Sequence, residues 1–219
     1  MQFSLQHLSR SPEEASESPP LLILLHGVGS NMYDLFGLAP YLDKRFLILS
    51  AQAPNAMQPG SFAWFPILEF QPTDIKIDAE AAEASRLQVI KFIKEAVESY
   101  KADPENVYLM GFSQGCIMSM SAMLSEPELL AGVVGMSGRI LPEIEPKIAD
   151  NERLKDFPVL WVHGLNDNVL PISHGRAARD QLTALPVDLT YKEYQMAHEV
   201  SGESLHDVAA WLTSQLDDD

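Results

Sequence analysis

The sequence predicts an α/β fold in which helices flank a mostly parallel central sheet. Apolar runs of four or five residues alternate along the chain with longer segments of helical period, and turns containing Gly, Pro, Asn and Asp separate them. Such runs are typical of strands that are buried on both faces of a parallel sheet. With 219 residues, of which 46% are hydrophobic and 21% charged, the chain is expected to form a single domain over 1–219.

The apolar runs give the expected strands. Five core strands are predicted at 21–25, 46–49, 107–110, 132–136 and 159–162. The segment 188–194 alternates polar and apolar residues, which suits a strand nearer the edge of the sheet. Another edge strand is expected at 3–8.

Segments of helical period lie between these strands. Helices are predicted at 32–42, 78–101, 114–124, 173–182 and 201–216. In the second of these, apolar residues recur every three or four positions, and Asp103-Pro104 follows as a stop signal. Its apolar face is expected to consist of Leu87, Ile90, Ile93, Val97 and Tyr100.

Two stretches are predicted to be irregular. The first, 9–20, is rich in Ser, Pro and Glu and is expected to be a surface loop. The second, 51–73, holds four prolines among aromatic and aliphatic residues, and a long apolar loop of this kind usually covers or binds something. Within it, Trp64 and Phe65 are candidate substrate contacts, with packing on the sheet as an equal alternative.

The pentapeptide Gly111-Phe112-Ser113-Gln114-Gly115 joins a predicted strand to a predicted helix. It fits the G-x-S-x-G pattern, in which glycines flank a serine held in a strained turn where strand and helix nearly touch. The turn presents the serine hydroxyl at the carboxyl edge of the sheet, beside a helix N-terminus that favours an oxyanion. Ser113 is therefore the predicted nucleophile.

A serine nucleophile needs a base and an acid that orients the base, and both are expected just beyond strand ends. Asp167 lies four residues after His163, where a predicted strand ends, and His198 lies four residues after Tyr194. The order Ser, acid, His is that of α/β-hydrolases. We therefore predict a Ser113–Asp167–His198 triad. Other candidates fall inside predicted helices or precede a strand: His174, His206, Asp150, Glu152 and Asp156.

The turn His26-Gly27-Val28-Gly29 closes the first core strand. Its glycines let backbone amides approach a substrate oxygen, so the oxyanion hole is assigned to the Val28 and Gln114 N–H groups. His26 and His163 are interpreted as structural histidines. Cys116 follows the nucleophile inside an apolar helix and is interpreted as a packing residue.

Composition excludes several classes of function. With 15 Lys plus Arg against 31 Asp plus Glu, the formal charge of −16 argues against nucleic-acid binding and against tight docking on anionic membranes. One cysteine can form neither an intramolecular disulfide nor a cysteine zinc cage. No signal-peptide pattern and no apolar segment of membrane-spanning length is present, so a cytoplasmic protein without stable membrane insertion is expected.

Taken together, the motifs at 26–29, 111–115, 163–171 and 196–198 resemble those of the bacterial phospholipase/carboxylesterase family, which also includes the acyl-protein thioesterases. The likeness covers about 21–216. It implies an α/β-hydrolase fold, a serine hydrolase without metal or other cofactor, and the triad and oxyanion-hole residues named above. It also matches Trp64 to the tryptophan of the family's active-site loop.

The chain departs from the family pattern at two positions. Pro66 stands where many members have an acidic residue two places after that tryptophan, which leaves acyl-chain preference open. Cys116 stands where alanine or glycine is more common.

The predicted function is that of a serine carboxylesterase that hydrolyses short- to medium-chain esters through an acyl-enzyme. The alternatives are an acyl-protein or acyl-CoA thioesterase, for which the apolar segment 57–70 would supply a groove, a lysophospholipase and, last, a non-catalytic binding protein of this fold. A homodimer is left open. The predicted elements leave no room for a cap domain between Ser113 and Asp167, so a shallow site is expected, roofed at most by the loop around Trp64.

Overall fold

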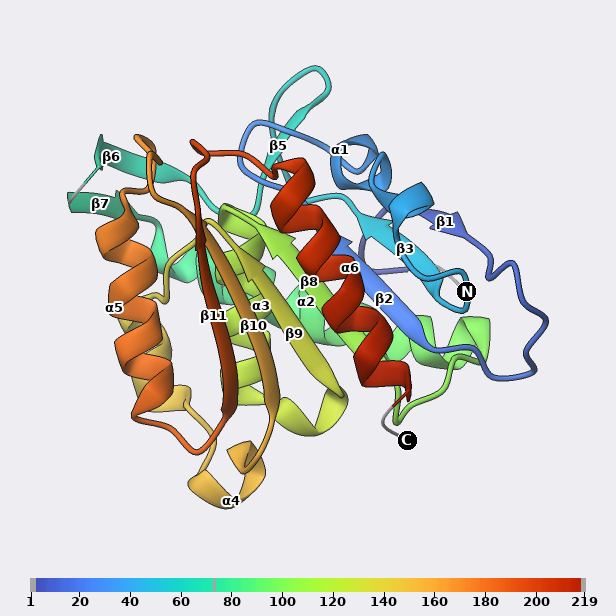
Figure 1. Ribbon diagram of the computed structural model, residues 1–219. Helices are drawn as coiled ribbons and strands as arrows, with labels where there is room; N and C mark the ends of the chain where they lie inside the picture. Colours follow the sequence, from blue (N-terminus) through green and yellow to red (C-terminus); the bar gives the residue numbers. More distant parts are fainter. Residues whose placement is uncertain (1–2, 73, 218–219) are drawn as a thin grey trace.

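The main sheet is the centre of the fold. The structure is a computed structural model and describes residues 3–72 and 74–217. Within these residues seven strands pair in the order β1-β3-β2-β8-β9-β10-β11 (Figure 1). They span β1 His7–Arg10, β2 Leu21–Leu25, β3 Leu47–Ala51, β8 Val107–Phe112, β9 Gly132–Met136, β10 Pro158–Gly164 and β11 Asp188–Tyr194. β1 runs antiparallel to β3, while the other neighbours are parallel, which confirms the predicted sheet.

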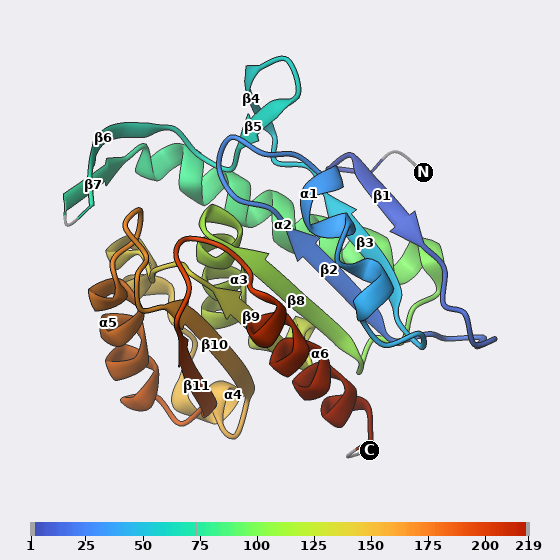
Figure 2. The ribbon, with the colours of Figure 1, turned by 45° about the horizontal axis from the view of Figure 1, so that its top comes forward.

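Helices cover both faces of this sheet. The helical elements are α1 Tyr33–Phe36, η1 Ala39–Tyr41, α2 Ala79–Tyr100, α3 Gln114–Ser125, η2 Pro127–Leu129, η3 Pro142–Lys147, α4 Asn151–Leu154, α5 Ile172–Thr183 and α6 Gly202–Asp217. α2, α3 and α5 pack into one core cluster, and α1 and α6 pack into the cluster on the opposite face (Figure 2). Among the residues described, no helix is both long and apolar enough to cross a membrane.

The strand β2 shows why the core runs are continuously apolar. Leu21, Ile23 and Leu25 belong to the cluster beneath α2 and α3, whereas Leu22 and Leu24 belong to the cluster beneath α1 and α6. Successive side chains of a strand point to opposite faces, so a strand covered on both faces needs apolar residues at every position.

The predicted edge strand at 3–8 is displaced along the chain. β1 begins at His7 and continues through Arg10, into the stretch expected to be a loop, because its residues pair with β3 from Ala51 back to Ile48. Phe3 lies outside the strand and packs its ring against Phe92 of α2 instead. Phe3 therefore packs against the core beside α2 and is not part of a strand.

The predicted helix at 32–42 is broken into α1 and η1. Leu38 is the residue before η1, and Pro40 lies in its first turn. Proline lacks an N–H and cannot continue the hydrogen-bond ladder of the preceding turn, so it starts a new one. The apolar period survives the break, since Leu35, Ala39 and Leu42 are all buried.

The stretch 51–73, predicted to be irregular, contains short strands. β4 Asn55–Gln58 pairs with β5 Ser61–Ala63, and β6 Ile67–Gln71 pairs with β7 Asp74–Ile77, both antiparallel. Thr73, the last residue of the predicted stretch, lies outside the described residues. The β6–β7 hairpin extends from the body of the molecule beside α5 (Figures 1 and 2). Short hairpins with irregular register escape a search for periodic patterns.

The buried face of α2 differs from the predicted one at its start. Leu87 is 49% exposed, while Val89, Phe92 and Ala96 are fully buried. The helix begins after Asp78, whose side chain accepts a hydrogen bond from the Ala81 amide at 3.0 Å. Because Leu87 is exposed and Val89, Phe92 and Ala96 are buried, the buried face of α2 is rotated about the helix axis relative to the predicted face.

Candidate active site

Ser113 lies in a sharp turn between β8 and α3. Its φ of 54° and ψ of −116° place a non-glycine residue in a strained region. A Cβ on Gly111 would lie 2.2 Å from the Gly115 carbonyl oxygen, and one on Gly115 would lie 1.8 Å from the Leu25 carbonyl oxygen. Strand, turn and helix therefore approach so closely that only glycine fits on either side of Ser113.

Three predicted residues from three different loops meet at this turn. The Ser113 Oγ lies 3.0 Å from His198 Nε2, and His198 Nδ1 lies 2.7 Å from Asp167 Oδ2. Asp167 follows β10 and His198 follows β11, so the parallel strands deliver both side chains to the edge where β8 delivers Ser113. The arrangement allows His198 to accept the Ser113 proton while it donates to Asp167.

Asp167 is held on both oxygens. Its Oδ1 accepts hydrogen bonds from the Leu170 amide at 2.8 Å and the Val169 amide at 2.9 Å, which leaves Oδ2 for His198. Burial acts to raise the pKa of Asp167, but the hydrogen bonds from His198 and the two amides outweigh it and hold the pKa below its usual range. The ring of Phe112 packs beside that of His198, with 4.9 Å between the ring centroids.

The two predicted oxyanion-hole residues also reach this turn. Val28 follows β2, whose residue Leu25 is paired with Gly111 of β8, so the loop after β2 begins beside the turn. Gly29 has a φ of 81°, and its N–H donates to the Phe62 carbonyl at 2.8 Å, which anchors that loop. Val28, Ser113 and Gln114 line one cavity.

The side chain of Gln114 has a second role that the sequence did not reveal. Its Oε1 accepts from the Trp64 amide at 2.9 Å, and its Nε2 donates to the Phe65 carbonyl at 2.8 Å. The Trp64 indole is fully buried and donates to the His26 carbonyl at 2.8 Å. Of the two predicted substrate contacts, the structure brings Phe65 to the cavity wall, whereas Trp64 packs in the core outside that wall.

The cavity beside Ser113 encloses about 370 Å³, part of it open to solvent, and its wall is mainly apolar. The β6–β7 hairpin supplies Ile67, Phe70, Ile75 and Ile77 to it. The other lining residues are Val28, Phe65, Ser113, Gln114, Ile117, Arg139, Val169 and Leu170. The sequence identified 57–70 as the source of an apolar groove but not β7, where the alternation of Ile75 and Ile77 with polar residues was the available signal.

Two other histidines near the site, His26 and His163, bind backbone groups, and His163 Nε2 also lies 3.6 Å from Asp167 Oδ2. His26 has Nδ1 2.7 Å from the Gly27 carbonyl oxygen, and its Nε2 accepts from the Ala53 amide at 3.1 Å. His163 has Nε2 2.8 Å from the Leu170 carbonyl oxygen. Burial lowers the pKa of both imidazoles, which keeps them neutral and structural, as the sequence predicts.

Cys116 is completely buried, and burial raises the pKa of its thiol. A Cβ on Gly138 would lie 2.4 Å from the Cys116 Sγ, and one on Gly135 would lie 2.9 Å from the same atom. The larger residue at 116 is thus accommodated because both facing positions are glycine. A buried, protonated thiol is a packing group and not a nucleophile.

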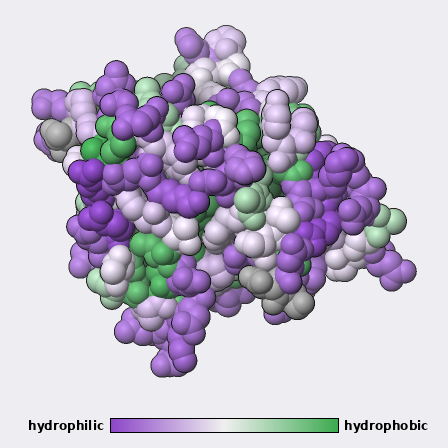
Figure 3. Space-filling view, viewed as in Figure 1, coloured by the Kyte–Doolittle hydropathy of each residue, from purple (hydrophilic) through white to green (hydrophobic). Residues whose placement is uncertain are grey.

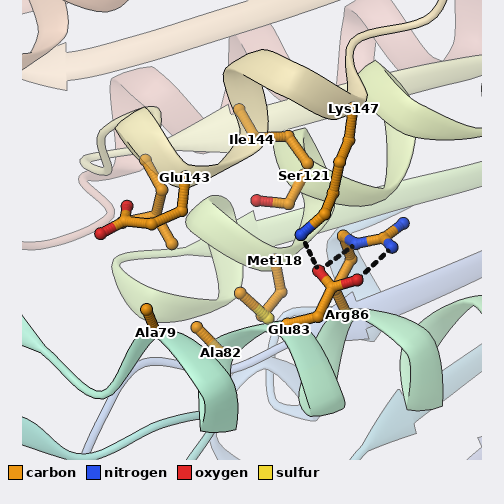
Figure 4. A pocket seen from close by; sticks show the side chains of 10 residues that line it. Ala79, Ala82, Glu83, Arg86, Met118, Ser121, Glu143, Ile144 and Lys147 are labelled. Carbon is orange, nitrogen blue, oxygen red and sulfur yellow. Dashed lines mark hydrogen bonds and ion pairs between the residues drawn. The ribbon is translucent and has the colours of Figure 1, made fainter.

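A second cavity, of about 280 Å³ and partly open, lies between α2, α3 and η3 (Figure 4). Glu83 joins its walls: Arg86 binds the carboxylate at 2.7 and 2.9 Å, and Lys147 binds it at 2.9 Å. No group of three His, Cys, Asp or Glu side chains suited to a metal ion occurs in 3–72 or 74–217. At this cavity the ion pair of Glu83 with Lys147 connects α2 to η3.

Several known proteins are similar to this chain in sequence or in fold. The chain is 30% identical to a protein of Kluyveromyces lactis named acyl-protein thioesterase 1, over 94% of this chain and 96% of that protein. It is 28% identical to a probable carboxylesterase, SOBER1-like, of Arabidopsis thaliana, over 89% of this chain and 78% of that protein. Crystal structures of esterase PE8 and of the Bacillus cereus carboxylesterase share the fold, with TM-scores of 0.81 and 0.79, at 24% and 22% identity. The match to esterase PE8 covers 96% of this chain and 98% of the PE8 chain. The match to the Bacillus cereus carboxylesterase covers 96% of this chain and 94% of the carboxylesterase chain.

The sequence profile described as Phospholipase/Carboxylesterase matches residues 10–216. The match takes in nearly the whole chain, including every strand after β1 and the turns that carry Ser113, Asp167 and His198. The chain therefore belongs to the phospholipase/carboxylesterase family.

Proposed function

We propose that the protein hydrolyses short- to medium-chain carboxylic esters through an acyl-enzyme formed on Ser113. The observation that carries the proposal is the continuous hydrogen-bonded path from the Ser113 Oγ to His198 at 3.0 Å and on to Asp167 at 2.7 Å. It starts at a serine that the backbone holds in a strained turn beside an apolar cavity. Family membership supports the same class of reaction.

In the first half of the reaction, the Ser113 Oγ attacks the ester carbonyl carbon while His198 Nε2 takes the hydroxyl proton. Asp167 stabilises the imidazolium that forms and keeps Nδ1 protonated. The negative charge that develops on the carbonyl oxygen is stabilised by the Val28 and Gln114 amides. His198 then donates its proton to the departing alcohol, and the acyl group stays on Ser113.

In the second half, His198 takes a proton from water, and the resulting hydroxide attacks the acyl carbonyl through the same oxyanion hole. Collapse of this intermediate releases the acid, and His198 returns the proton to the Ser113 Oγ. The cycle needs no group beyond these residues and water. The Phe112 ring and the Oδ1 contacts of Asp167 keep the imidazole aligned through both halves.

Replacement of the nucleophile tests the proposal. We expect Ser113→Ala to lose at least about 10³-fold in kcat on p-nitrophenyl butyrate, because no acyl-enzyme can form. Ser119→Ala is the matched control, since it removes another buried hydroxyl of the same helix, one with no hydrogen-bond partner within the described residues. Wild-type activity in Ser113→Ala, or fluorophosphonate labelling at another residue, would refute the scheme.

A thioesterase is the second candidate. It is favoured by the name of the Kluyveromyces lactis relative and by the apolar hairpin, on which Leu68 and Phe70 are 64% and 51% exposed. Figure 3 shows a mostly hydrophilic face with smaller apolar patches, one of them at the upper left where the hairpin and the start of α5 lie in Figure 1. Esters and thioesters of two to sixteen carbons separate the candidates, since a preference for the longest thioesters favours the second. A lysophospholipid added to the panel tests that alternative.

The cytoplasmic location, the homodimer and the single domain stay predictions. Analytical ultracentrifugation of the purified chain measures the oligomeric state directly. Limited proteolysis measures whether the chain is cut into stable parts, which a single domain would not produce.

A further inference from the structure

Arg139 differs from the other arginines of the protein in how few partners its charge has. Among the described residues, five arginines form ion pairs with carboxylates: Arg45, Arg86, Arg153, Arg176 and Arg179. Arg10 forms no ion pair there but donates to three backbone carbonyls. Arg139 has no carboxylate partner within the same residues, and its guanidinium makes one hydrogen bond, from Nη2 to the Ile75 carbonyl at 3.2 Å.

The position of Arg139 is set by the turn that holds the nucleophile. A Cβ on the preceding residue, Gly138, would lie 3.3 Å from the Ser113 carbonyl oxygen. The backbone just before Arg139 therefore lies beside Ser113. From there the side chain crosses to β7, and it lines the same cavity as Ser113 and Gln114. The other lining side chains, Gln114 and Ser113 aside, are apolar.

The surroundings give this charge no ion pair within the described residues. Burial lowers the pKa of Arg139, and Glu143 opposes this by attraction from a distance, without forming an ion pair. Figure 4 shows the carboxylate of Glu143 turned away from the cluster of Glu83, Arg86 and Lys147. In that second cavity the guanidinium of Arg86 is bound on two nitrogens by Glu83. Arg139 has no equivalent of Glu83 in the part of the chain that the structure describes.

A guanidinium carries five N–H donors in a planar fork that matches a carboxylate or phosphate on two atoms. One of these donors is used by Ile75. Arg139 is partly buried, so some of its hydration is lost without an ion pair in return, and an anion that enters the cavity would offset that loss. The remaining donors of Arg139 can thus bind an anion in the cavity that Ser113 also lines.

We propose that Arg139 binds an anionic group of the substrate, so that the preferred esters carry a carboxylate or phosphate separated from the scissile carbonyl by a short apolar chain. The apolar wall between Ser113 and Arg139 contacts the chain, and the guanidinium contacts its charged end. The proposal rests on ester hydrolysis at Ser113 and adds the class of substrate. Arg139 is a specificity residue and takes no part in proton transfer.

Matched substrates test this directly. The p-nitrophenyl monoester of adipic acid and p-nitrophenyl 6-methylheptanoate have acyl groups of nearly the same shape, and only the first ends in a carboxylate. We expect the wild-type protein to have a kcat/KM about tenfold or more higher for the adipate ester, the effect of one charge-assisted contact. Equal values, or a preference for the neutral ester, overturn the proposal for anions carried on the acyl side.

The anion could also belong to the alcohol. A second pair, 4-acetoxybutyrate and 4-methylpentyl acetate, places the carboxylate on the leaving group, and acetyl glycerol phosphate against acetyl glycerol does the same for phosphate. A preference for the charged member of either pair assigns the anion to the alcohol side. No preference in any of the three pairs overturns the proposal as a whole.

Variants identify the residue responsible. In Arg139→Met the ratio of kcat/KM for the charged ester to kcat/KM for the neutral ester is expected to fall about tenfold or more. Arg139→Lys keeps the positive charge but not the planar fork of donors, so its ratio is expected to lie between those of the wild type and Arg139→Met. Arg153→Met is the matched control, because it removes one positive charge at α4, far from the β6–β7 hairpin (Figure 1). Equal losses for both esters in Arg139→Met would show that the residue only braces Ile75, which overturns the proposal.

Binding without turnover separates this inference from the proposed function. Calorimetric titration of Ser113→Ala with adipate is expected to show binding that weakens about tenfold or more when Arg139→Met is added. If the wild type hydrolyses neutral esters and Ser113→Ala binds neither adipate nor 4-acetoxybutyrate nor acetyl glycerol phosphate, the anion site is refuted and ester hydrolysis stands. If adipate binds through Arg139 and no ester is hydrolysed, the proposed reaction fails instead.

Discussion

At the scale of single residues, Asp167 shows how one side chain can combine two tasks. Its Oδ1 closes the turn that follows β10 by accepting the Val169 and Leu170 amides, and its Oδ2 faces His198. The hydrogen bonds that fold the turn therefore also fix the direction of the second oxygen. This supports the assignment of Asp167 over other acids, because the proposed catalytic contact is built into the local fold.

Asp167→Asn is predicted to separate these two tasks. The amide oxygen can still accept from the turn, but the amide nitrogen faces His198 and favours the tautomer that cannot accept the Ser113 proton. We expect kcat on p-nitrophenyl butyrate to fall about 10³- to 10⁴-fold, with little change in Tm. Asp180→Asn, an exposed residue of α5, is the control. Retention of more than about a tenth of wild-type kcat would contradict the assigned role.

At the scale of elements, the contact between β2, β8 and α3 determines the turn at Ser113, the proposed nucleophile. The Gly115 backbone lies so close to Leu25 that no Cβ fits between them. This close approach places the start of α3 against the end of β2, where the Val28 loop begins. The proposed oxyanion hole and nucleophile are thus positioned by one packing contact.

Gly115→Ala is predicted to disrupt that contact. A methyl group 1.8 Å from the Leu25 carbonyl oxygen must push backbone away from backbone, which cannot be relieved by a side-chain rotation. We expect a loss of about 3 kcal/mol or more in the free energy of unfolding, measured by urea denaturation, together with loss of esterase activity. Gly202→Ala is the control, since nothing lies within 4 Å of its Cβ. Equal stabilities of the two variants would argue against so close a contact between β2 and α3.

The ion pairs of the second cavity join α2 to η3. Hydrogen bonding by Arg86, with a smaller effect of Lys147, lowers the pKa of Glu83 to about 2 against the opposing effect of burial. A carboxyl whose pKa is lowered on folding stabilises the folded state above its unfolded pKa, and that stabilisation is lost as the pH falls toward the folded value. For Glu83 this window runs from about pH 4.5 down to about pH 2.

Glu83→Gln is therefore predicted to destabilise the protein by about 1–2 kcal/mol at pH 7, a value reduced for the partial exposure of this carboxylate. The difference from wild type should shrink as the pH falls through the window from 4.5 to 2. Urea denaturation at a series of pH values measures this difference in the free energy of unfolding. Glu98→Gln, which changes an exposed residue of α2, is the control. A difference that is the same at pH 3 and pH 7 would show that charge is not its source.

At the scale of the whole molecule, the net charge of −16 opposes the exposed apolar hairpin. Leu68 and Phe70 offer apolar surface to a lipid interface, whereas the overall field repels an anionic one. The two effects can be measured separately, because only the electrostatic one depends on ionic strength.

We predict that any binding to phosphatidylcholine vesicles decreases when phosphatidylserine is added and that salt reduces this decrease, since salt screens the repulsion. Co-sedimentation at low and high ionic strength measures the bound fraction. Stronger binding to phosphatidylserine vesicles would mean that a local patch of opposite charge overrides the net charge.

The local pattern of the sequence determined the parts of the molecule that have regular burial. Each run of apolar residues from 21–25 to 159–162 became a strand because both faces of a parallel sheet are covered, and that condition is visible in any short window. The turn at Ser113 was equally local, since strand, glycines and helix are adjacent in sequence. The proposed acid Asp167 and base His198 were predicted from the rule that parallel strands end at one edge of the sheet.

Tertiary structure decided the features that depend on distant contacts. Leu87 fits the apolar stripe of α2 yet is exposed, because the packing of the helix on α3 and the sheet sets its rotation. The burial of Trp64 depends on hydrogen bonds with Gln114 and His26. The cavity depends on the pairing of β6 with β7, two strands that the sequence pattern did not predict. Arg139 became a candidate site only once its surroundings within the described residues were known to hold no carboxylate partner. The sequence by itself determines which side chains are present, but the partner that each one finds, or lacks, is decided by chain segments far away.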